Sequence, residues 1–369
     1  MKNTFGNQVS ITLFGESHGA AIGAVLDGLA PGIPVDEDEI RHALSLRRAT
    51  GNLSTARQES DPFVIESGVW NGVTTGTPIC ILIPNQSQHS RDYAALRGKA
   101  RPGHADYTAF CKYHGYEDYR GGGHFSGRIT AALVAAGTIA RGALRQNGIQ
   151  LGTHMARCAG IADRAFDVTD PENDLDFLAD AVFPVLDAEA AEDMKDAILA
   201  AKEEGDSVGG VLETLVLGMP AGVGEPWFDT VESVLSHALF GIPAVKGVEF
   251  GDGFALSELC GSQANDAFRA DADGNVFTAT NRNGGINGGI TNGMPLRFRC
   301  AVKPTPSIYK VQQTADFLTG ENVELQIEGR HDPCIVHRAR AVVDAVTAIV
   351  LCDLLAGRYG TDWLGGDGV

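Results

Sequence analysis

The chain has 369 residues, of which 44% are hydrophobic and 21% charged, so it can bury a large core. Its formal net charge of −18 argues against non-specific binding to nucleic acids or membranes, because both are anionic. Seven cysteines, an odd number without a C-x-x-C pair, predict neither a disulfide framework nor a zinc site and favour a reducing, cytoplasmic location. No apolar run reaches about 18 residues and MKNTFGNQVSITLF lacks the apolar core of a signal peptide, so we expect no membrane span.

Hydrophobic periodicity and boundary residues predict the main elements in chain order. The expected elements are a helix at 36–46, a strand at 73–83, helices at 126–147 and 187–204, strands at 209–220 and 295–303, and a helix at 336–358. The helix at 126–147 has the clearest limits, because Ser126 suits its start and Gly148 follows its end.

Glycine-rich segments repeat in the two halves of the chain. GESHGAAIGAVLDGLAPGIP at 15 resembles GDSVGGVLETLVLGMPAGVG at 205, and RGGGHFSGR before one helix is loosely echoed by NGGINGGITNG and GRHDP before another. We expect a single domain over 1–369 with related halves at 15–150 and 205–358. Chance similarity among glycine-rich strand–turn segments is the alternative.

The segment GESHG at 15–19 has the G-x-S-x-G spacing of the nucleophile elbow of serine hydrolases. That elbow needs a helix after the serine, but Ser17 is followed by AAIGAVLDGLAPGIP, which is poor helix material. A similar segment, GDSVGG, differs from the GDSGG of trypsin-like proteases by the inserted Val208. A hydrolase built on Ser17 is therefore kept only as an alternative.

Histidine, arginine, lysine and serine side chains gather in the glycine-rich segments. Taken singly, each is more simply a solvated loop residue or a partner of a helix end. Taken together, they predict a small, multiply anionic ligand and acid–base chemistry. No metal-ligand spacing is present. The residues concerned are His18, Arg47, Arg48, His104, Arg120, His124, Ser126, Arg128, Lys303, Ser307, Arg330, His331 and Asp332.

The motifs GESHG, RPGHADYT, RGGGHFSGR, NGGINGGITNGMP, KPTPSI and GRHDPCI, in this order, resemble those of the chorismate synthase family. The resemblance implies an α+β fold, a β-α-β sandwich with two pseudo-symmetric halves, and a homotetramer. It also implies a lyase that converts 5-enolpyruvylshikimate 3-phosphate to chorismate and phosphate by 1,4-anti elimination, the last common step of the shikimate pathway to aromatic amino acids. The reaction requires reduced FMN, which is thought to lend electron density as phosphate leaves and then to take the ring proton.

The resemblance also implies roles for individual residues. His18 matches the histidine that protonates the departing phosphate, and His104 the one near the N1/O2 edge of the flavin. Asp332 matches the acid that assists deprotonation through flavin N5. Ser17 and Ser126 match serines that relay protons or hydrogen-bond beside these groups, so Ser17 is expected to support His18 and not to act as a nucleophile.

Binding residues follow from the same motifs. The substrate's anionic groups are assigned to Arg47, Arg48 and Arg128. Flavin contacts are expected from His124, Phe125, Ser126, Pro243, Ala244, Gly288, Lys303, Pro304, Thr305, Pro306, Ser307 and Arg330. No metal is expected.

The arginine-rich loop departs from the family pattern. This chain has RRATGNLSTARQESD where relatives read like R-R-x-P-G-x-S-R, so the second arginine is missing and Arg57 is the nearest basic residue downstream. His124, Phe125 and Pro243 also replace residue types common at these positions. A flavin-binding or phosphate-sensing protein without catalysis is therefore a further alternative. With no G-x-G-x-x-G fingerprint, we expect NADPH to act only indirectly, through an external flavin reductase.

Overall fold

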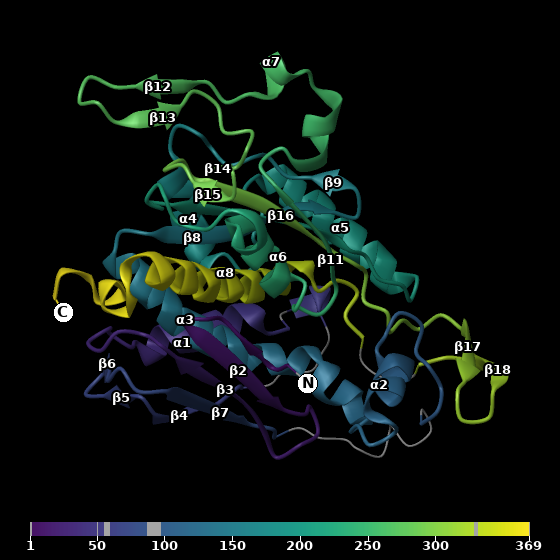
Figure 1. Ribbon diagram of the computed structural model, residues 1–369. Helices are drawn as coiled ribbons and strands as arrows, with labels where there is room; N and C mark the ends of the chain where they lie inside the picture. The colour runs from purple at the N-terminus through teal and green to yellow at the C-terminus, as the bar shows by residue number, and fades with distance from the viewer. Residues whose placement is uncertain (1, 50, 55–59, 87–96, 328–330, 369) are drawn as a thin grey trace.

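The computed structural model describes residues 2–49, 51–54, 60–86, 97–327 and 331–368. Two five-stranded antiparallel sheets enclose a layer of helices (Figure 1). The first sheet has the order β1-β2-β3-β7-β4 and the second β11-β16-β10-β8-β9. Their strands are β1 (Thr4–Phe5), β2 (Ser10–Gly15), β3 (Ala21–Asp27), β4 (Val64–Ser67), β7 (Ile79–Pro84), β8 (Gln150–Cys158), β9 (Ile161–Ala162), β10 (Gly210–Leu217), β11 (Val245–Phe250) and β16 (Leu296–Val302).

The helices between the sheets are α1 (Glu37–Arg47), α3 (Thr130–Gln146) and α8 (Val336–Tyr359). Helix α3 follows the first sheet in the chain and α8 follows the second, so each half supplies one sheet and one long helix. Most side chains of α3 and α8 are buried all round, as expected for helices covered on both sides. A Cβ on Gly137 of α3 would lie 2.3 Å from the Cβ of Ala345, so glycine is needed where the two helices cross.

Smaller elements surround this sandwich. The other helices are α2 (Asp106–Tyr113), α4 (Pro171–Asp180), α5 (Ala188–Glu203), α6 (Val231–Leu239) and α7 (Gly261–Ala264), with 3₁₀ segments at Gly51–Leu53, Arg120–Phe125, Gly127–Ile129, Trp227–Asp229, Gly253–Glu258 and Thr361–Gly368. The two-stranded sheets pair β5 (Val69–Trp70) with β6 (Val73–Thr74), β12 (Phe268–Ala270) with β13 (Val276–Thr278), β14 (Ile286–Asn287) with β15 (Ile290–Thr291), and β17 (Gln312–Asp316) with β18 (Glu321–Leu325).

The predicted fold class, an α+β sandwich of the β-α-β type, is confirmed by these layers. The four expected helices match α1, α3, α5 and α8, and the strands at 209–220 and 295–303 match β10 and β16. The single strand expected at 73–83 is wrong, because β6 and β7 are separated by a turn at Gly76, whose φ is +78°. The internal echo between 15–150 and 205–358 stays a prediction.

A buried carboxylate joins the two ends of the described chain. Asp353 of α8 accepts hydrogen bonds from the backbone amides of Asn7, Gln8 and Val9, at 2.6–3.0 Å. These amides lie just before β2, so the last long helix is fastened directly to the first sheet.

A second buried ionic group crosses the other sheet. The His154 ring lies 2.7 Å from Asp163 Oδ2 through Nδ1 and 3.2 Å from Glu213 Oε2 through Nε2. Burial alone would lower the pKa of His154, but these hydrogen bonds raise it above its ordinary value. The same contacts outweigh burial at both carboxyls and lower the pKa values of Asp163 and Glu213. The ring is therefore held as an imidazolium that donates to both carboxylates.

Replacing His154 with glutamine is expected to lower the free energy of unfolding by about 3–5 kcal/mol, because two buried carboxylates lose their cation. The pKa of His154 is raised by folding, so its stabilisation is fully present below about pH 6.5, the ordinary pKa of histidine, and is lost as the pH rises through the raised value. Urea unfolding at several pH values should show the largest deficit near pH 5–6 and a smaller one in alkaline buffer. A deficit independent of pH would mean that the ring is neutral in the fold.

Candidate active site

Ser17 and His18 lie in the turn between β2 and β3. The segment after Ser17 forms strand β3 and not a helix, so the local structure is not a nucleophile elbow. Ser17 Oγ lies 3.0 Å from His18 Nδ1 and 3.1 Å from the carbonyl oxygen of Gly121. The Ser17 hydroxyl donates to this carbonyl oxygen, so Ser17 Oγ accepts from His18 Nδ1–H and His18 Nε2 points away from the serine.

The triple-glycine turn passes between two histidines. Gly121, Gly122 and Gly123 have φ values of +60°, +84° and +53°, which side chains with a Cβ rarely adopt. A Cβ on Gly121 would lie 2.3 Å from Cε1 of His18, and a Cβ on Gly122 would lie 3.0 Å from Cε1 of His104. The glycines therefore let one thin turn of backbone contact both histidines, which are far apart in the sequence.

Two charged neighbours orient His104. Asp106 Oδ1 lies 3.1 Å from His104 Nδ1, and Arg101 donates to both carboxylate oxygens of Asp106, at 2.7 and 2.8 Å. Burial alone would raise the pKa of Asp106, but the hydrogen bonds from Arg101 and His104 lower it well below its usual range. Arg101 Nη2 also lies 3.1 Å from His104 Nδ1, but its shorter contact, at 2.7 Å, is with Asp106 Oδ1. A carboxylate only accepts, so we assign the proton on Nδ1 to the hydrogen bond with Asp106.

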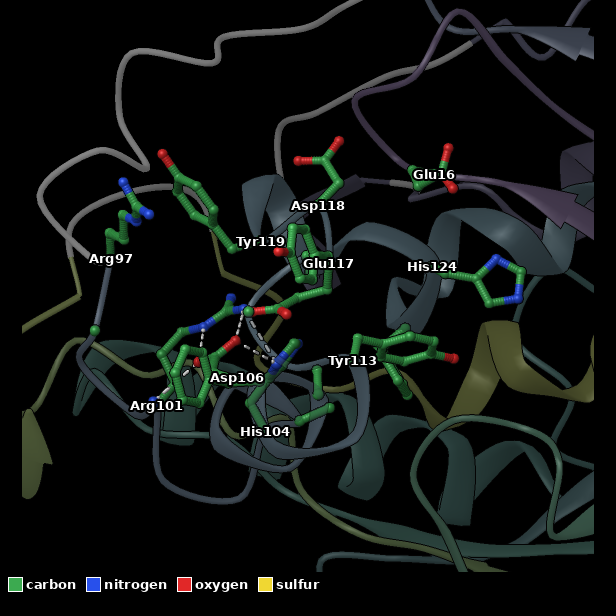
Figure 2. A pocket seen from close by; sticks show the side chains of 18 of the residues that line it. Glu16, Arg97, Arg101, His104, Asp106, Tyr113, Glu117, Asp118, Tyr119 and His124 are labelled. Atoms are coloured by element: carbon green, nitrogen blue, oxygen red, sulfur yellow. Dashed lines mark hydrogen bonds and ion pairs between the residues drawn. The ribbon is translucent and has the colours of Figure 1, made fainter. Parts of the chain in front are cut away.

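A pocket of about 590 Å³ opens beside these residues (Figure 2). His104 and His124 both line it, and Figure 2 shows them on opposite sides of Tyr113. Basic side chains from 97–101 and aromatic rings line it, as do four carboxylates: Glu16, Asp106, Glu117 and Asp118. His124 is held by its Nδ1, 2.7 Å from the carbonyl oxygen of Gly15, which ties the pocket to the end of β2.

The three predicted anion-binding arginines converge on one buried carboxylate. Arg47 and Arg128 form ion pairs with Asp61, and Nε of Arg48 lies 3.8 Å from it. Arg47 also donates to the carbonyl oxygen of Gly127, at 3.0 Å, beside Ser126. Ser126 starts the 3₁₀ segment before α3, and its Oγ accepts from the amide of Arg128.

The segment Lys303–Ser307 contacts the loop that carries His104. Lys303 Nζ donates to the carbonyl oxygen of Gly103, and a Cβ on Gly103 would meet Pro306 at 3.3 Å. The amide of Lys303 donates to the carbonyl oxygen of Ala244, at 3.0 Å, so the expected Pro243–Ala244 contact lies next to it. Within the described residues, the buried Thr305 Oγ1 has no hydrogen-bond partner.

The GDSVGG segment connects the neighbourhood of Asp332 to the Lys303–Ser307 segment. Ser207 Oγ donates to the carbonyl oxygen of Thr305, at 2.7 Å. The amide of Val208 donates to the carbonyl oxygen of Pro333, at 2.8 Å. Asp332 itself is paired with Arg338 of α8. The GDSVGG segment therefore links Lys303–Ser307 to the residues next to Asp332 through hydrogen bonds.

One expected flavin residue, Gly288, is not brought to this region. Gly288 lies in the β14–β15 turn, far in Figure 1 from β17, which follows the Lys303–Ser307 segment. Arg330 lies outside the described residues, as does Arg57.

Sequence reasoning missed several supporting residues. Arg101 and Asp106 flank His104 inside RPGHAD, so a carboxylate two residues from a histidine was an available signal. Asp61 and Asn85 had no local signal, because their partners are far away in the sequence. Arg338, the partner of Asp332, lies in an apolar helix whose sequence pattern gives no sign of that ion pair.

Metal sites and membrane-spanning helices are both absent from the part of the chain that the structure describes. No three His, Cys, Asp or Glu side chains in the described part of the chain are grouped so that they could hold a metal ion. Every helix among the described residues is too short or too polar to serve as a membrane span.

Comparison with known proteins supplies the family. The family model described as "Chorismate synthase" matches residues 9–356. The chorismate synthase of Dehalococcoides mccartyi strain BAV1 is 48% identical over 355 residues, covering 96% of each chain, and that of Thermococcus gammatolerans is 47% identical over 354 residues, covering 96% of this chain and 97% of that one. A solved structure titled "Crystal Structure of Chorismate Synthase" matches with a TM-score of 0.75 and 30% identity, over 97% of this chain and 94% of the other. The chain therefore belongs to the chorismate synthase family of enzymes.

Proposed function

We propose that the protein converts 5-enolpyruvylshikimate 3-phosphate to chorismate and phosphate, as a carbon–oxygen lyase that requires reduced FMN. The observation that supports this most is the triple-glycine turn, which contacts His18 through Gly121 and His104 through Gly122. A 1,4-anti elimination needs one group to receive the leaving phosphate and another, across the ring, to help remove a proton. The turn fixes His18, assigned to the departing phosphate, relative to His104, assigned to the edge of the flavin that receives the proton.

The residues present fit a flavin. The pocket beside His104 has aromatic walls, which suit a flat ring system. Its charged lining is mixed, with Arg97 and Lys99 suited to a phosphate and Glu117 and Asp118 nearby. The unpaired hydroxyl of Thr305 and the ammonium group of Lys303 adjoin the same loop and would hydrogen-bond to ring or phosphate oxygens. Further contacts would come from His124, Phe125, Ser126, Pro304, Pro306 and Ser307, from Pro243 and Ala244, and from Arg330 and Gly288. Reduced FMN held by these residues would supply electron density and a base for the ring proton.

Each side chain then has a definite task. Arg47, Arg48 and Arg128 hold the substrate's anionic groups by charge-assisted hydrogen bonds. His18, with Nδ1–H held by Ser17, delivers a proton from Nε2 to the departing phosphate. His104, with Nδ1–H held by Asp106, presents Nε2 towards the flavin edge. Asp332 assists ring deprotonation, and Arg338 orients its carboxylate.

The assembly and setting belong to the same proposal. We assign the protein to a homotetramer in the cytoplasm, at the last shared step of the shikimate pathway, with flavin reduced by an external NADPH-dependent reductase. The position of Gly288, apart from the other expected flavin residues, supports an assembly in which a neighbouring copy brings that turn to the site.

Anaerobic turnover with photoreduced FMN tests the proposal. Chorismate absorbance should rise when 5-enolpyruvylshikimate 3-phosphate is added, and no turnover should occur with oxidised FMN. Flavin binding without turnover would favour the sensor alternative. Ester hydrolysis without flavin binding would favour the hydrolase, against which the strand after Ser17 argues.

Asp106→Asn is expected to reduce kcat by roughly 10- to 10²-fold, because an amide can present a donor to His104 Nδ1 and favour the wrong tautomer. KM should change little, since Asp106 is assigned no contact with substrate. Steady-state kinetics over pH 6–9 with saturating reduced FMN measures this. Asp38→Asn, on an exposed aspartate at the start of α1, is the control and should leave kcat unchanged.

A further inference from the structure

A single carboxylate, which no motif had singled out, organises the anion-binding arginines. The side chain of Asp61 is fully buried, and those of Arg47 and Arg128 are only 8% and 7% exposed. Arg47 Nη1 donates to Oδ2 and Arg128 Nη1 donates to Oδ1, so each guanidinium holds a different oxygen. The spacing of the two arginines is thus set by the width of one carboxylate.

Three arginines share this carboxylate. Asp61 forms ion pairs with Arg47 and Arg128 and lies 3.8 Å from Nε of Arg48, so one acceptor orients three guanidinium groups. Guanidinium groups gathered at one place suit the binding of carboxylate or phosphate.

The backbone at Asp61 is held in an uncommon conformation. Its φ is +47°, in the left-handed region, although the next residue is Pro62, which favours an extended residue before it. Such conformations persist where the surroundings determine them and cluster at ligand sites. The carboxylate is therefore placed at the arginines at some cost to the local backbone.

The same cluster is connected to His18. Arg128 Nε donates to Asn85 Oδ1, at 3.0 Å, and Asn85 Nδ2 donates to the carbonyl oxygens of Glu16 and Gly19, at 3.0 and 2.9 Å. These carbonyls flank Ser17 and His18 in the β2–β3 turn. The position of the arginines and that of the proton-transfer histidine thus depend on one chain of contacts.

We infer that Asp61 is a positioning residue for substrate binding: it sets the spacing of Arg47 and Arg128 for the anionic groups of the substrate and, through Asn85, aligns them with His18. This inference rests on the proposed function. Asp61 does not contact the substrate, and its effect is exerted through the arginines.

Asp61→Asn tests the inference, because the amide places a donor against a guanidinium that can only donate, so one arginine must move. We expect KM for 5-enolpyruvylshikimate 3-phosphate to rise by at least about tenfold while kcat falls less, since uniform binding is lost. Asp61→Glu keeps the charge but shifts it by one methylene, and should give a smaller rise in KM in a well-folded protein. Asp353→Asn is the matched control, a buried carboxylate remote from the arginines that should lower Tm without changing KM.

Two readouts separate this inference from the proposed function. Turnover by the wild type tests the function, and calorimetric titration of the substrate into wild type and variants with oxidised FMN tests the positioning without turnover. Wild-type KM and Kd in both Asp61 variants, with only Tm lowered as in Asp353→Asn, would overturn the inference. If Asp61→Asn fails to fold, wild-type affinity in Asp61→Glu alone would overturn it.

Discussion

Replacing His18 with alanine is expected to slow chorismate formation by roughly 10²-fold or more, because a positioned proton donor is lost from the departing phosphate. His18 is 5% exposed and is held through Nδ1 by Ser17, so its Nε2 is presented in a fixed direction. The loss should fall on kcat, measured anaerobically with photoreduced FMN. Flavin binding, followed by fluorescence quenching, should be unchanged.

Two variants control for this result. Ser17→Ala removes only the acceptor of His18 Nδ1–H, so its kcat should lie between those of wild type and His18→Ala. His42→Ala changes a half-exposed histidine on α1 and should leave kcat at the wild-type value. A His18→Ala enzyme with wild-type kcat would remove His18 from the mechanism and leave the phosphate to be protonated by another group.

Gly121→Ala is expected to have the second-largest effect. The new Cβ would lie 2.3 Å from His18 Cε1 and 2.6 Å from Ser17 Oγ, so the ring or the turn must move. A displacement of about 1 Å in a catalytic group can cost on the order of 10²-fold in rate. The φ of +60° adds a backbone cost of about 1–2 kcal/mol to folding. Both kcat and Tm should therefore fall.

Gly160→Ala separates the two costs. Gly160 has a φ of +87°, but a Cβ there would meet no atom within 4 Å, so the variant carries backbone strain without a collision. Its Tm should fall as in Gly121→Ala while kcat stays at the wild-type value. Equal kcat in the two variants would mean that the close approach of the turn to His18 has no catalytic importance.

Features of this protein that depend on residues close together in the sequence could be predicted, and features that depend on distant residues could not. Helices α3 and α8 are long apolar segments, and Ser126 and Gly148 mark the limits of the first, so each could be located without its partner. His18 and His104 stand in long motifs, and their local neighbours Ser17 and Asp106 are within two residues. Asp61 had no such signal, because its role comes from Arg128, which is 67 positions away, and only the folded chain brings the two together.

The two glycines that pass between the histidines show the same limit in another way. The run RGGGHFSG predicts a turn near an anion. It does not say that Gly121 contacts His18, 103 positions earlier in the chain, and that Gly122 contacts His104. These contacts depend on the packing of the β2–β3 turn against the Arg120–Phe125 segment.

The fastening of Asn7, Gln8 and Val9 to Asp353 has a consequence for biosynthesis. The bonded residues are 344 to 346 positions apart, and the core between the sheets lacks α8 until that helix has been made. Helix α3 can cover the first sheet early, but the contact that ties the start of β2 to α8 and the part of the core that α8 fills form only near the end of translation. A contact between residues this far apart in the sequence makes closure of the chain a late, slow event.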